Sequence, residues 1–138
     1  MKDLTLTLPF PPSVNHYWRH VTLPLGKGKK GFRVQTLISA DGRKYKESVC
    51  QEVLRQRIVL GITAPVMMSV LLCPPDRRRR DVDNYAKALL DSLVEAKVLK
   101  DDSQIRDLRL VWADAMPGGK AVVSIRSMAV PPAQGKLI

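Results

Sequence analysis

Residues 66–73 constrain the fold more than any other segment, with the sequence Val-Met-Met-Ser-Val-Leu-Leu-Cys. This run is short, apolar and partly β-branched, which is typical of a buried strand at the centre of a sheet. Pro74 and Pro75 end it, because proline removes a backbone donor that the strand ladder needs. We therefore expect a sheet built around residues 66–73, with helices covering it.

Periodic patterns predict further elements on both sides of this strand. Leu4–Leu8 alternates apolar and polar residues, which predicts a half-buried strand. Apolar residues at helical spacing predict one amphipathic helix over residues 41–60 and a second from Asp83 or Asn84 to about Lys97. Each helix has a single apolar stripe, so both can pack on the sheet.

The rest of the chain is assigned to two strands and a loop. Strands are expected over residues 105–113 and 121–128, joined as a tight hairpin through Pro117-Gly118-Gly119-Lys120. Residues 13–36 are rich in Asn, His, Lys, Arg and Gly, and we expect them to form a long surface loop.

The length and element order predict one domain of mixed class. A chain of 138 residues, 45% of them hydrophobic, suits one compact core and is too short for two ordinary domains. The order of elements is strand, helix, strand, helix and strand pair. It predicts an α+β fold, with a single small mixed β-sheet and two main helices packed on one face. The domain is expected to span residues 1–138, with residues 129–138 as a flexible tail.

The charge of the chain points to nucleic acid. There are 23 Lys and Arg residues against 13 Asp and Glu residues, a net charge of +10 that attracts polyanions. No apolar stretch approaches the roughly 20 residues that cross a bilayer, and there is no secretory signal, so we expect no membrane partner and a cytoplasmic protein. Within the 13–36 loop, the charge of Gly26–Gly31 favours a DNA-contacting arm over a passive linker. Cys50 and Cys73 are expected to be reduced thiols.

Two aspartates, Asp81 and Asp83, follow four arginines just after the central strand, in Arg77-Arg78-Arg79-Arg80-Asp81-Val82-Asp83-Asn84. If residues 81–83 are extended, both carboxylates point to one side and Val82 points to the core. Two close carboxylates repel each other unless a cation lies between them, and Mg²⁺ is held by such oxygen ligands. The alternative is that they only neutralise the arginines and cap the next helix. These residues alone do not decide between the two interpretations.

A second acidic pair, Asp101-Asp102, lies between the second helix and the strand that follows it. Alone, an Asp-Asp pair in this place is an ordinary turn. The next strand can run beside the central strand, so the chain can bring this pair close to Asp81 and Asp83. Because further carboxylates complete a ligand set, the two pairs together favour a metal site.

Lys87 lies four residues after Asp83 and four before Asp91, so all three fall on one helical face. In one interpretation they form a ladder of surface ion pairs. In the other, Lys87 lies beside the metal, where its ammonium group holds the scissile phosphate or stabilises charge on its oxygens. Asp91 then orients Lys87 or is structural.

Two basic clusters are candidates for DNA contact. The arginines Arg77–Arg80 outnumber the nearby acids, and guanidinium groups bind phosphate oxygens through paired hydrogen bonds. We expect them to contact the phosphate backbone, with the alternative that some brace the fold. The cluster His16-Tyr17-Trp18-Arg19-His20 either stacks on unpaired bases or folds the first loop over the sheet. His16 and His20 have no companion ligands of zinc type, so no zinc site is expected.

Three stretches of the sequence resemble the RusA family of Holliday junction resolvases, found in bacteria and their prophages. They are Cys73–Asn84 with Lys87, Leu99–Gln104, and the opening segment Leu8–His20. Together they span most of the chain, in the right order and with plausible spacing. There are two departures: the loop around Gly26 to Phe32 is longer than the family pattern leads us to expect, and the tail after Met128 has no counterpart.

The resemblance implies a small homodimeric endonuclease that binds four-way junction DNA and makes paired symmetric nicks, in DNA recombination and repair. It implies that the catalytic residues are Asp81, Asp83, Asp102 and Lys87, with the three aspartates as metal ligands and Asp101 as an accessory acid. Mg²⁺ is the expected cofactor, with Mn²⁺ as a substitute. The expected DNA contacts are Arg77, Arg78, Arg79, Arg80, Asn84, Lys87, Asn15 and Arg19.

Two other functions stay open on the residues alone. A non-catalytic nucleic-acid-binding module explains the net charge equally well. It does not explain the acids beside the most basic run, because carboxylates near phosphates weaken binding unless a metal intervenes. A metal nuclease acting on other branched or single-stranded substrates would use the same site, and only the resemblance favours four-way junctions.

Overall fold

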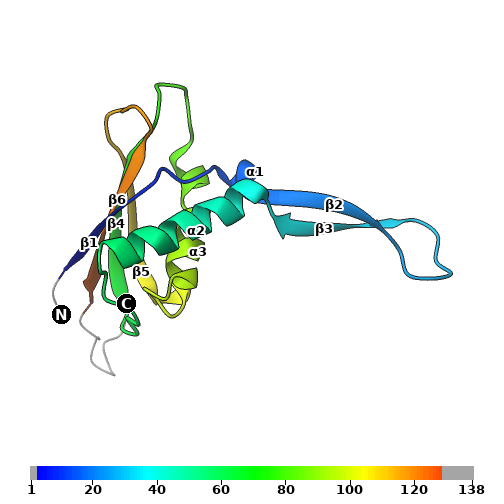
Figure 1. The fold of residues 1–138 in the computed structure, drawn as a ribbon, viewed down its shortest axis with the longest axis horizontal. Coiled ribbons are helices and arrows are strands. Elements are labelled where there is room, and N and C mark those ends of the chain that lie inside the picture. Colours follow the sequence, from blue (N-terminus) through cyan, green and yellow to red (C-terminus); the bar gives the residue numbers. More distant parts are fainter. Residues whose placement is uncertain (1–2, 129–138) are drawn as a thin grey trace, which may run out of the picture.

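A computed structural model describes residues 3–128 of the chain. Its strands and helices (Figure 1) are β1 (Leu4–Leu8), α1 (Val14–Tyr17), β2 (Trp18–Pro24), β3 (Phe32–Ile38), α2 (Ala40–Arg55), β4 (Val66–Cys73), α3 (Lys87–Glu95), β5 (Ile105–Trp112) and β6 (Lys120–Ser127). Two short 3₁₀ turns, η1 (Val82–Tyr85) and η2 (Asp102–Gln104), precede α3 and β5. The tail predicted to be flexible, residues 129–138, lies outside the described residues.

Strand β4 lies inside a four-stranded sheet with the order β1-β6-β4-β5. It pairs antiparallel with β6 and parallel with β5, and β6 also pairs antiparallel with β1. The sheet is therefore mixed, and β4 has a partner on both edges. The prediction of a central strand over residues 66–73 is confirmed with the same bounds.

Helices α2 and α3 lie together on one face of this sheet (Figure 1). On β4, Val66, Met68, Val70 and Leu72 alternate into the core and are at most 1% exposed, whereas Leu71 on the other face is 45% exposed. Burying an aliphatic side chain of this size stabilises the fold by about 1.5–3 kcal/mol. The predicted α+β class, with two main helices on a mixed sheet, is confirmed, but the prediction of a single sheet is wrong, because β2 and β3 form a second, two-stranded sheet.

The predicted hairpin between the last two strands is wrong. β5 and β6 flank β4 on opposite edges instead of pairing with each other. The turn itself forms, with φ of 81° at Gly118 and 65° at Gly119, and the Gly119 amide donates to the Met116 carbonyl at 2.9 Å. Residues 113–119 also cross the end of β4, so the chain enters β6 beyond it. The helix α3 provides the crossover that the parallel β4–β5 pair needs.

Most of the segment 13–36, predicted as a loop, forms α1 and a β-hairpin. β2 and β3 pair from Trp18 with Ile38 at the base to Pro24 with Phe32 near the tip. This hairpin with its turn, residues 18–38, is called the arm below, and it extends away from the sheet and helices (Figure 1). The prediction gave too much weight to glycine and lysine, which concentrate in the turn. The flanking stretches contain β-branched and aromatic residues that favour strands.

Both predicted main helices form, with different ends. α2 begins after Ser39, whose hydroxyl accepts the Gly42 amide at 3.0 Å. It ends at Arg55, earlier than predicted, and Arg57 then takes a φ of 54° and turns the chain. α3 is preceded by the separate turn η1 and ends at Glu95. Within residues 3–128, no helix is long and apolar enough to cross a membrane.

Candidate active site

The connection from β4 to α3 carries Asp81 and Asp83. Asp81 is extended, with φ −93° and ψ 125°, and its carbonyl accepts the Asn84 amide at 3.1 Å. The 3₁₀ turn η1 therefore starts at Val82, and the extended geometry considered for residues 81–83 does not form. Both aspartates are nevertheless exposed, while Val82 packs against the core. Their carboxylates are accessible to a ligand.

Arg80 differs from the other arginines of the run, because the fold holds its side chain. That side chain is 8% exposed, and its guanidinium group lies 2.8 Å from the Asp76 carboxylate. It also donates to the carbonyls of Asp76 and Arg78, at 3.0 and 3.2 Å, and lies 5.8 Å from the Phe10 ring centroid. Arg80 therefore braces the loop, which was the alternative interpretation for part of this run.

Asp76 organises the loop that presents the remaining arginines. Its carboxylate accepts the Arg78 amide at 3.0 Å and the Arg78 Nε at 3.2 Å. These bonds, with the one from Arg80, lower the pKa of Asp76 to about 2. The side chains of Arg77 and Arg79 are exposed and form no hydrogen bond or ion pair with any residue in 3–128. They are free to bind an anion.

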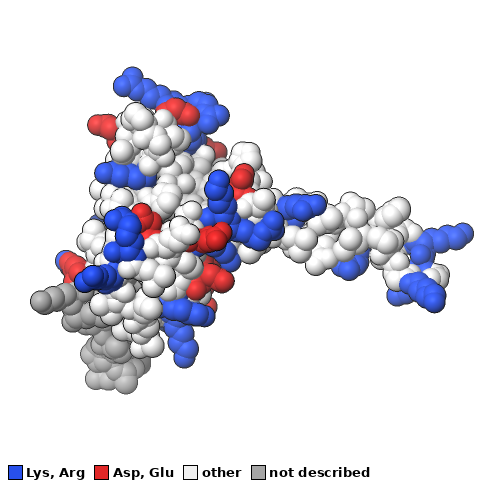
Figure 2. All heavy atoms as spheres, in the orientation of Figure 1, with Lys and Arg blue, Asp and Glu red and all other residues white. Residues whose placement is uncertain are grey.

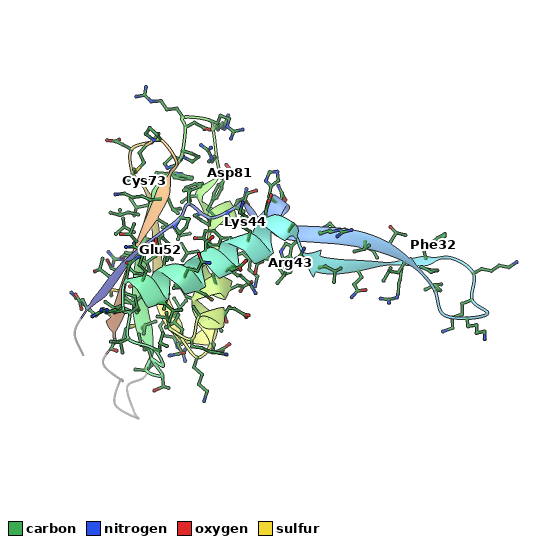
Figure 3. All side chains as sticks on the ribbon, viewed as in Figure 1. Phe32, Arg43, Lys44, Glu52, Cys73 and Asp81 are labelled. Carbon is green, nitrogen blue, oxygen red and sulfur yellow. The ribbon has the colours of Figure 1, made fainter. Side chains whose placement is uncertain are left out.

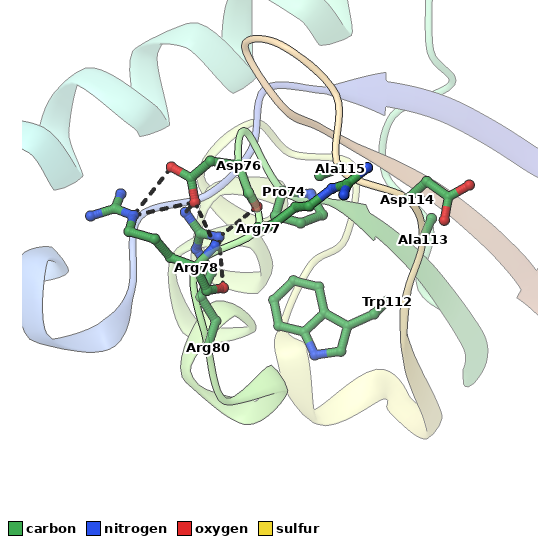
Figure 4. A pocket seen from close by; sticks show the side chains of 9 residues that line it. All are labelled: Pro74, Asp76, Arg77, Arg78, Arg80, Trp112, Ala113, Asp114 and Ala115. Atoms are coloured by element: carbon green, nitrogen blue, oxygen red, sulfur yellow. Dashed lines mark hydrogen bonds and ion pairs between the residues drawn. The ribbon is translucent and has the colours of Figure 1, made fainter.

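The arginine loop and the end of β5 border a basic hollow of about 620 Å³. Figure 4 shows its lining, which consists of Pro74, Asp76, Arg77, Arg78, Arg80, Trp112, Ala113, Asp114 and Ala115. Trp112 belongs to an aromatic group with Phe10 and Tyr85, whose ring centroids are 5.1, 5.7 and 6.3 Å apart. Cations and an aromatic ring in one hollow suit a phosphate and an adjacent base. No sequence pattern pointed to Trp112, because it reaches this hollow through the parallel pairing of β5 with β4.

Lys87 begins α3 and is linked to the first segment of the chain. Its Nζ lies 3.2 Å from the Asp91 carboxylate and 5.9 Å from the Trp18 ring centroid. The Tyr17 hydroxyl donates to the other Asp91 oxygen at 2.9 Å, and burial together with this carboxylate raises the pKa of Tyr17. Asp91 is thus held by two partners and orients the lysine. Asp83 lies in η1, outside the helical face that Lys87 and Asp91 share.

The cluster His16–His20 is divided between core and surface. Tyr17 is buried and Trp18 half-buried, with ring centroids 4.9 Å apart, which supports the interpretation that they fold this segment onto the body. The two histidines pair with neighbouring hydroxyl groups, His16 with Ser13 and His20 with Thr36. The remaining predicted DNA contacts are exposed or half-buried: Asn15, Arg19 and Asn84.

Asp101 and Asp102 have different surroundings. The Asp101 carboxylate accepts the Ser103 hydroxyl and, at 3.3 Å, the Ser103 amide, and these bonds lower the pKa of Asp101. Asp101 thereby caps η2. The exposed Asp102 carboxylate forms no ion pair or hydrogen bond in the described part of the chain, and it borders a hollow of about 230 Å³ with Lys46, Asp91 and Glu95. Of this acidic pair, Asp102 is the one with a free carboxylate.

The two acidic pairs do not meet within one chain. Asp81 and Asp83 precede α3 and Asp102 follows it, and a helix of nine residues is about 13 Å long. Because β5 runs parallel to β4, η2 lies where both strands begin, while Asp81 follows the end of β4. From residue 3 to residue 128, no three His, Cys, Asp or Glu side chains are grouped to hold a metal ion. Asp81 and Asp83 supply oxygen ligands of the kind Mg²⁺ uses, but one chain leaves the set incomplete.

Comparison with known proteins identifies the family. The sequence profile described as Endodeoxyribonuclease RusA matches residues 9–126. A protein of Escherichia coli strain K12 named crossover junction endodeoxyribonuclease RusA is 35% identical over 128 residues, which cover 93% of this chain and 98% of the relative. Relatives with the same name from Shigella sonnei and from Enterobacteria phage HK97 are 36% and 34% identical over the same shares. The chain therefore belongs to the RusA family of endodeoxyribonucleases.

Proposed function

We propose that this chain is a Mg²⁺-dependent Holliday junction resolvase that acts in the cytoplasm as a homodimer and makes paired symmetric nicks. One observation carries the proposal: the exposed carboxylates of Asp81 and Asp83 lie, along the chain, between an arginine-lined hollow and Lys87. Carboxylates in such a place repel DNA unless a cation bridges them to phosphate. The names of the relatives support crossover junctions as the substrate.

Each part of the site has a role in phosphodiester hydrolysis. The exposed arginines of the loop bind the phosphates beside the scissile one and fix its position. Lys87, oriented by Asp91, donates to a non-bridging oxygen of the scissile phosphate and stabilises charge that builds there. Asp81, Asp83 and Asp102 would hold Mg²⁺, or Mn²⁺ in its place, which supplies Lewis acidity and a nucleophilic water at neutral pH.

A homodimer accounts for the symmetry of the substrate and for the separated carboxylates. A four-way junction offers two equivalent scissile phosphates, and a twofold dimer presents two equivalent sites. Within one chain, Asp81 and Asp83 precede α3 and Asp102 follows it. Across a twofold axis, Asp102 of a second chain can complete the pair. We therefore propose that each metal site is shared between two chains.

The nuclease activity is tested with labelled four-way junction and linear duplex, in Mg²⁺ or in EDTA. We expect Mg²⁺-dependent cleavage of the junction, little cleavage of linear duplex, and loss of cleavage in Asp81→Asn with binding retained. Asp3→Asn is the matched control, because Asp3 is exposed and pairs with Arg126 at the far edge of the sheet. Cleavage of linear duplex at the same rate would rule out junction selectivity. Absence of cleavage on every branched and single-stranded substrate would leave only the non-catalytic binding module.

Sharing of the site is tested by mixing the inactive variants Asp81→Asn and Asp102→Asn. If the two aspartates act from different chains, a mixed dimer contains one intact site and one site with both substitutions. Mixing then restores a single nick in each junction, without the paired second nick. If both aspartates act within one chain, every site in the mixed dimer carries one substitution and mixing restores nothing. The second result would contradict the shared site and leave the nuclease activity in place.

A further inference from the structure

The arm, residues 18–38, meets the candidate site only at its base, where Trp18 lies beside Lys87. Its two strands form a sheet of their own, separate from the four-stranded sheet. It extends well beyond the rest of the molecule, with Phe32 towards its tip and Asp81 back in the body (Figure 3). A two-stranded ribbon is marginally stable alone in water. Its exposed faces therefore suit a partner that covers them.

The charge of the arm selects the kind of partner. From Leu4 to Ala40 the sequence has no Asp or Glu and five Lys or Arg residues, namely Arg19, Lys27, Lys29, Lys30 and Arg33. Figure 2 shows basic side chains at the tip of the arm, far from the acidic ones of the body. None of the five forms an ion pair with another residue in 3–128. A second copy of this chain, also at +10, is repelled by such a surface, whereas DNA is attracted.

One face of the arm leads from Lys87 to the exposed tip. The register places Phe32 opposite Pro24 and Trp18 opposite Ile38, so alternation puts these four residues on the same face. At the base, the Trp18 ring lies 5.9 Å from the Lys87 ammonium. Towards the tip, Phe32 is 72% exposed. A substrate held at Lys87 can therefore continue along this face.

We propose that the arm is a second DNA-contact surface, which follows one duplex arm of the branched substrate away from the scissile phosphate. Lys27, Lys29 and Lys30 bind backbone phosphates, and Phe32 packs against the sugars or base edges beneath them. Strands of seven residues extend about 23 Å, and phosphates of one DNA strand are spaced about 3.4 Å apart. The arm thus reaches about seven nucleotides beyond Lys87. This inference rests on the proposed function for its substrate.

The test compares wild type with Lys27→Gln/Lys29→Gln/Lys30→Gln in junction binding, measured by fluorescence anisotropy across a salt series without Mg²⁺. Loss of three phosphate contacts should lower the slope of log affinity against log salt by about 2.7. The control Arg55→Gln/Arg57→Gln/Arg126→Gln removes equal charge at the end of α2 and on β6, away from the arm. It should leave most of the slope unchanged. Equal slopes for the two triple variants would overturn the proposal.

Substrate length gives a second measurement. Shortening the duplex arms of the junction from about 20 to about 5 base pairs removes the phosphates that the tip would reach. Wild type and the lysine variant should then bind alike, whereas on long arms the variant should bind at least tenfold more weakly at low salt. A difference that persists on short arms contradicts a contact at that distance. If the lysine variant instead shifts the dimer dissociation constant in sedimentation, the arm contacts a second chain and the proposal fails.

Phe32→Ala separates the apolar contact from the charge. It should weaken binding to long-armed junctions several-fold while leaving the salt slope at its wild-type value, because no cation is lost. Unchanged affinity would remove Phe32 from the surface. All of these measurements are made without cleavage. They can therefore fail while Mg²⁺-dependent cleavage stands, or succeed on a chain that does not cleave.

Discussion

Lys87 and Asp91 form an ion pair along α3, with 3.2 Å between Nζ and Oδ1. The other oxygen of Asp91 accepts the hydroxyl of Tyr17, which is 74 residues away in sequence. Tyr17 is buried at the end of α1, so the first segment of the chain fixes the carboxylate that orients the lysine. In a nuclease site, the direction of an ammonium group decides which phosphate oxygen it stabilises.

Tyr17→Phe should slow cleavage without weakening junction binding. The ring stays in place while the bond to Asp91 is lost, which leaves Lys87 less well oriented. A loss of about 1 kcal/mol in transition-state stabilisation slows the chemical step about fivefold. Single-turnover cleavage at saturating enzyme measures this rate, and anisotropy measures binding.

Tyr45→Phe is the matched control for this prediction, because Tyr45 is also buried and donates to the Pro9 carbonyl at 2.8 Å. Both variants should lose about 1–2 kcal/mol of unfolding free energy, since each removes one buried hydrogen bond. Only Tyr17→Phe should slow cleavage. Equal cleavage rates for the two variants would show that Asp91 does not need Tyr17 to orient Lys87.

Local patterns predicted the elements better than their contacts. Residues 66–73 were correctly predicted to form a central strand, because a short apolar run between two turn signals is typical of a buried strand. The partners of that strand were harder to predict. The Gly118-Gly119 turn is compatible with a hairpin, and only the competition for the two edges of β4 places β5 and β6 apart. Strand order depends on contacts between segments far apart in sequence, so local sequence patterns do not predict it.

Individual residues of the candidate site could be proposed from the sequence, but their arrangement in space could not. Asp81 and Asp83 could be named as candidate metal ligands because two close carboxylates repel each other unless a cation lies between them. The turn η1 and the parallel direction of β5, which keep Asp102 away from them, are tertiary features. The two strands of the arm were missed for a related reason, since this segment was predicted to be a loop. Its strands pair only with each other and lack the continuous apolar run of a buried strand.

Arg80 and Arg79 are adjacent, but substitution of Arg80 should lower the stability of the fold, whereas substitution of Arg79 should weaken DNA binding. Arg80→Gln removes a nearly buried guanidinium group and its bonds to Asp76, which should cost about 1–3 kcal/mol in urea unfolding. Arg79→Gln changes an exposed side chain, so its stability should stay within about 0.5 kcal/mol of wild type. Its salt slope for junction binding should fall by about 0.9, as expected for one lost phosphate contact. Stability losses of equal size would contradict the distinction.

Gly42→Ala should destabilise the protein, although Gly42 lies inside α2. In an open helix the change gains about 1 kcal/mol from helix propensity. Here a Cβ atom would lie 2.7 Å from Ile38 Cγ2 and 2.9 Å from the Tyr17 carbonyl oxygen. Overpacking costs about 1–3 kcal/mol and should exceed the gain. Thermal unfolding measures the result, and Ser48→Ala on the same helix is the control. A higher melting temperature for Gly42→Ala than for wild type would contradict the prediction. It would show that α1 shifts to make room for the added methyl group at little energetic cost.

The link between Asp76 and the arginine loop should weaken in acid. The bonds from Arg78 and Arg80 lower the pKa of Asp76 to about 2 in the folded protein, against about 3.9 in an unfolded chain. A lowered pKa means that the folded state favours the ionised group, so its stabilisation is complete above about pH 4 and is lost as the pH falls towards 2.

Urea unfolding of wild type and Asp76→Asn at pH 7, 5, 4 and 3 should show wild type more stable by a constant amount down to about pH 4. Below that pH the difference should shrink, because the protonated aspartic acid and the asparagine are both neutral. A difference that is unchanged at pH 3, or that grows, would mean that the arginines do not depend on the charge of Asp76 to hold the loop.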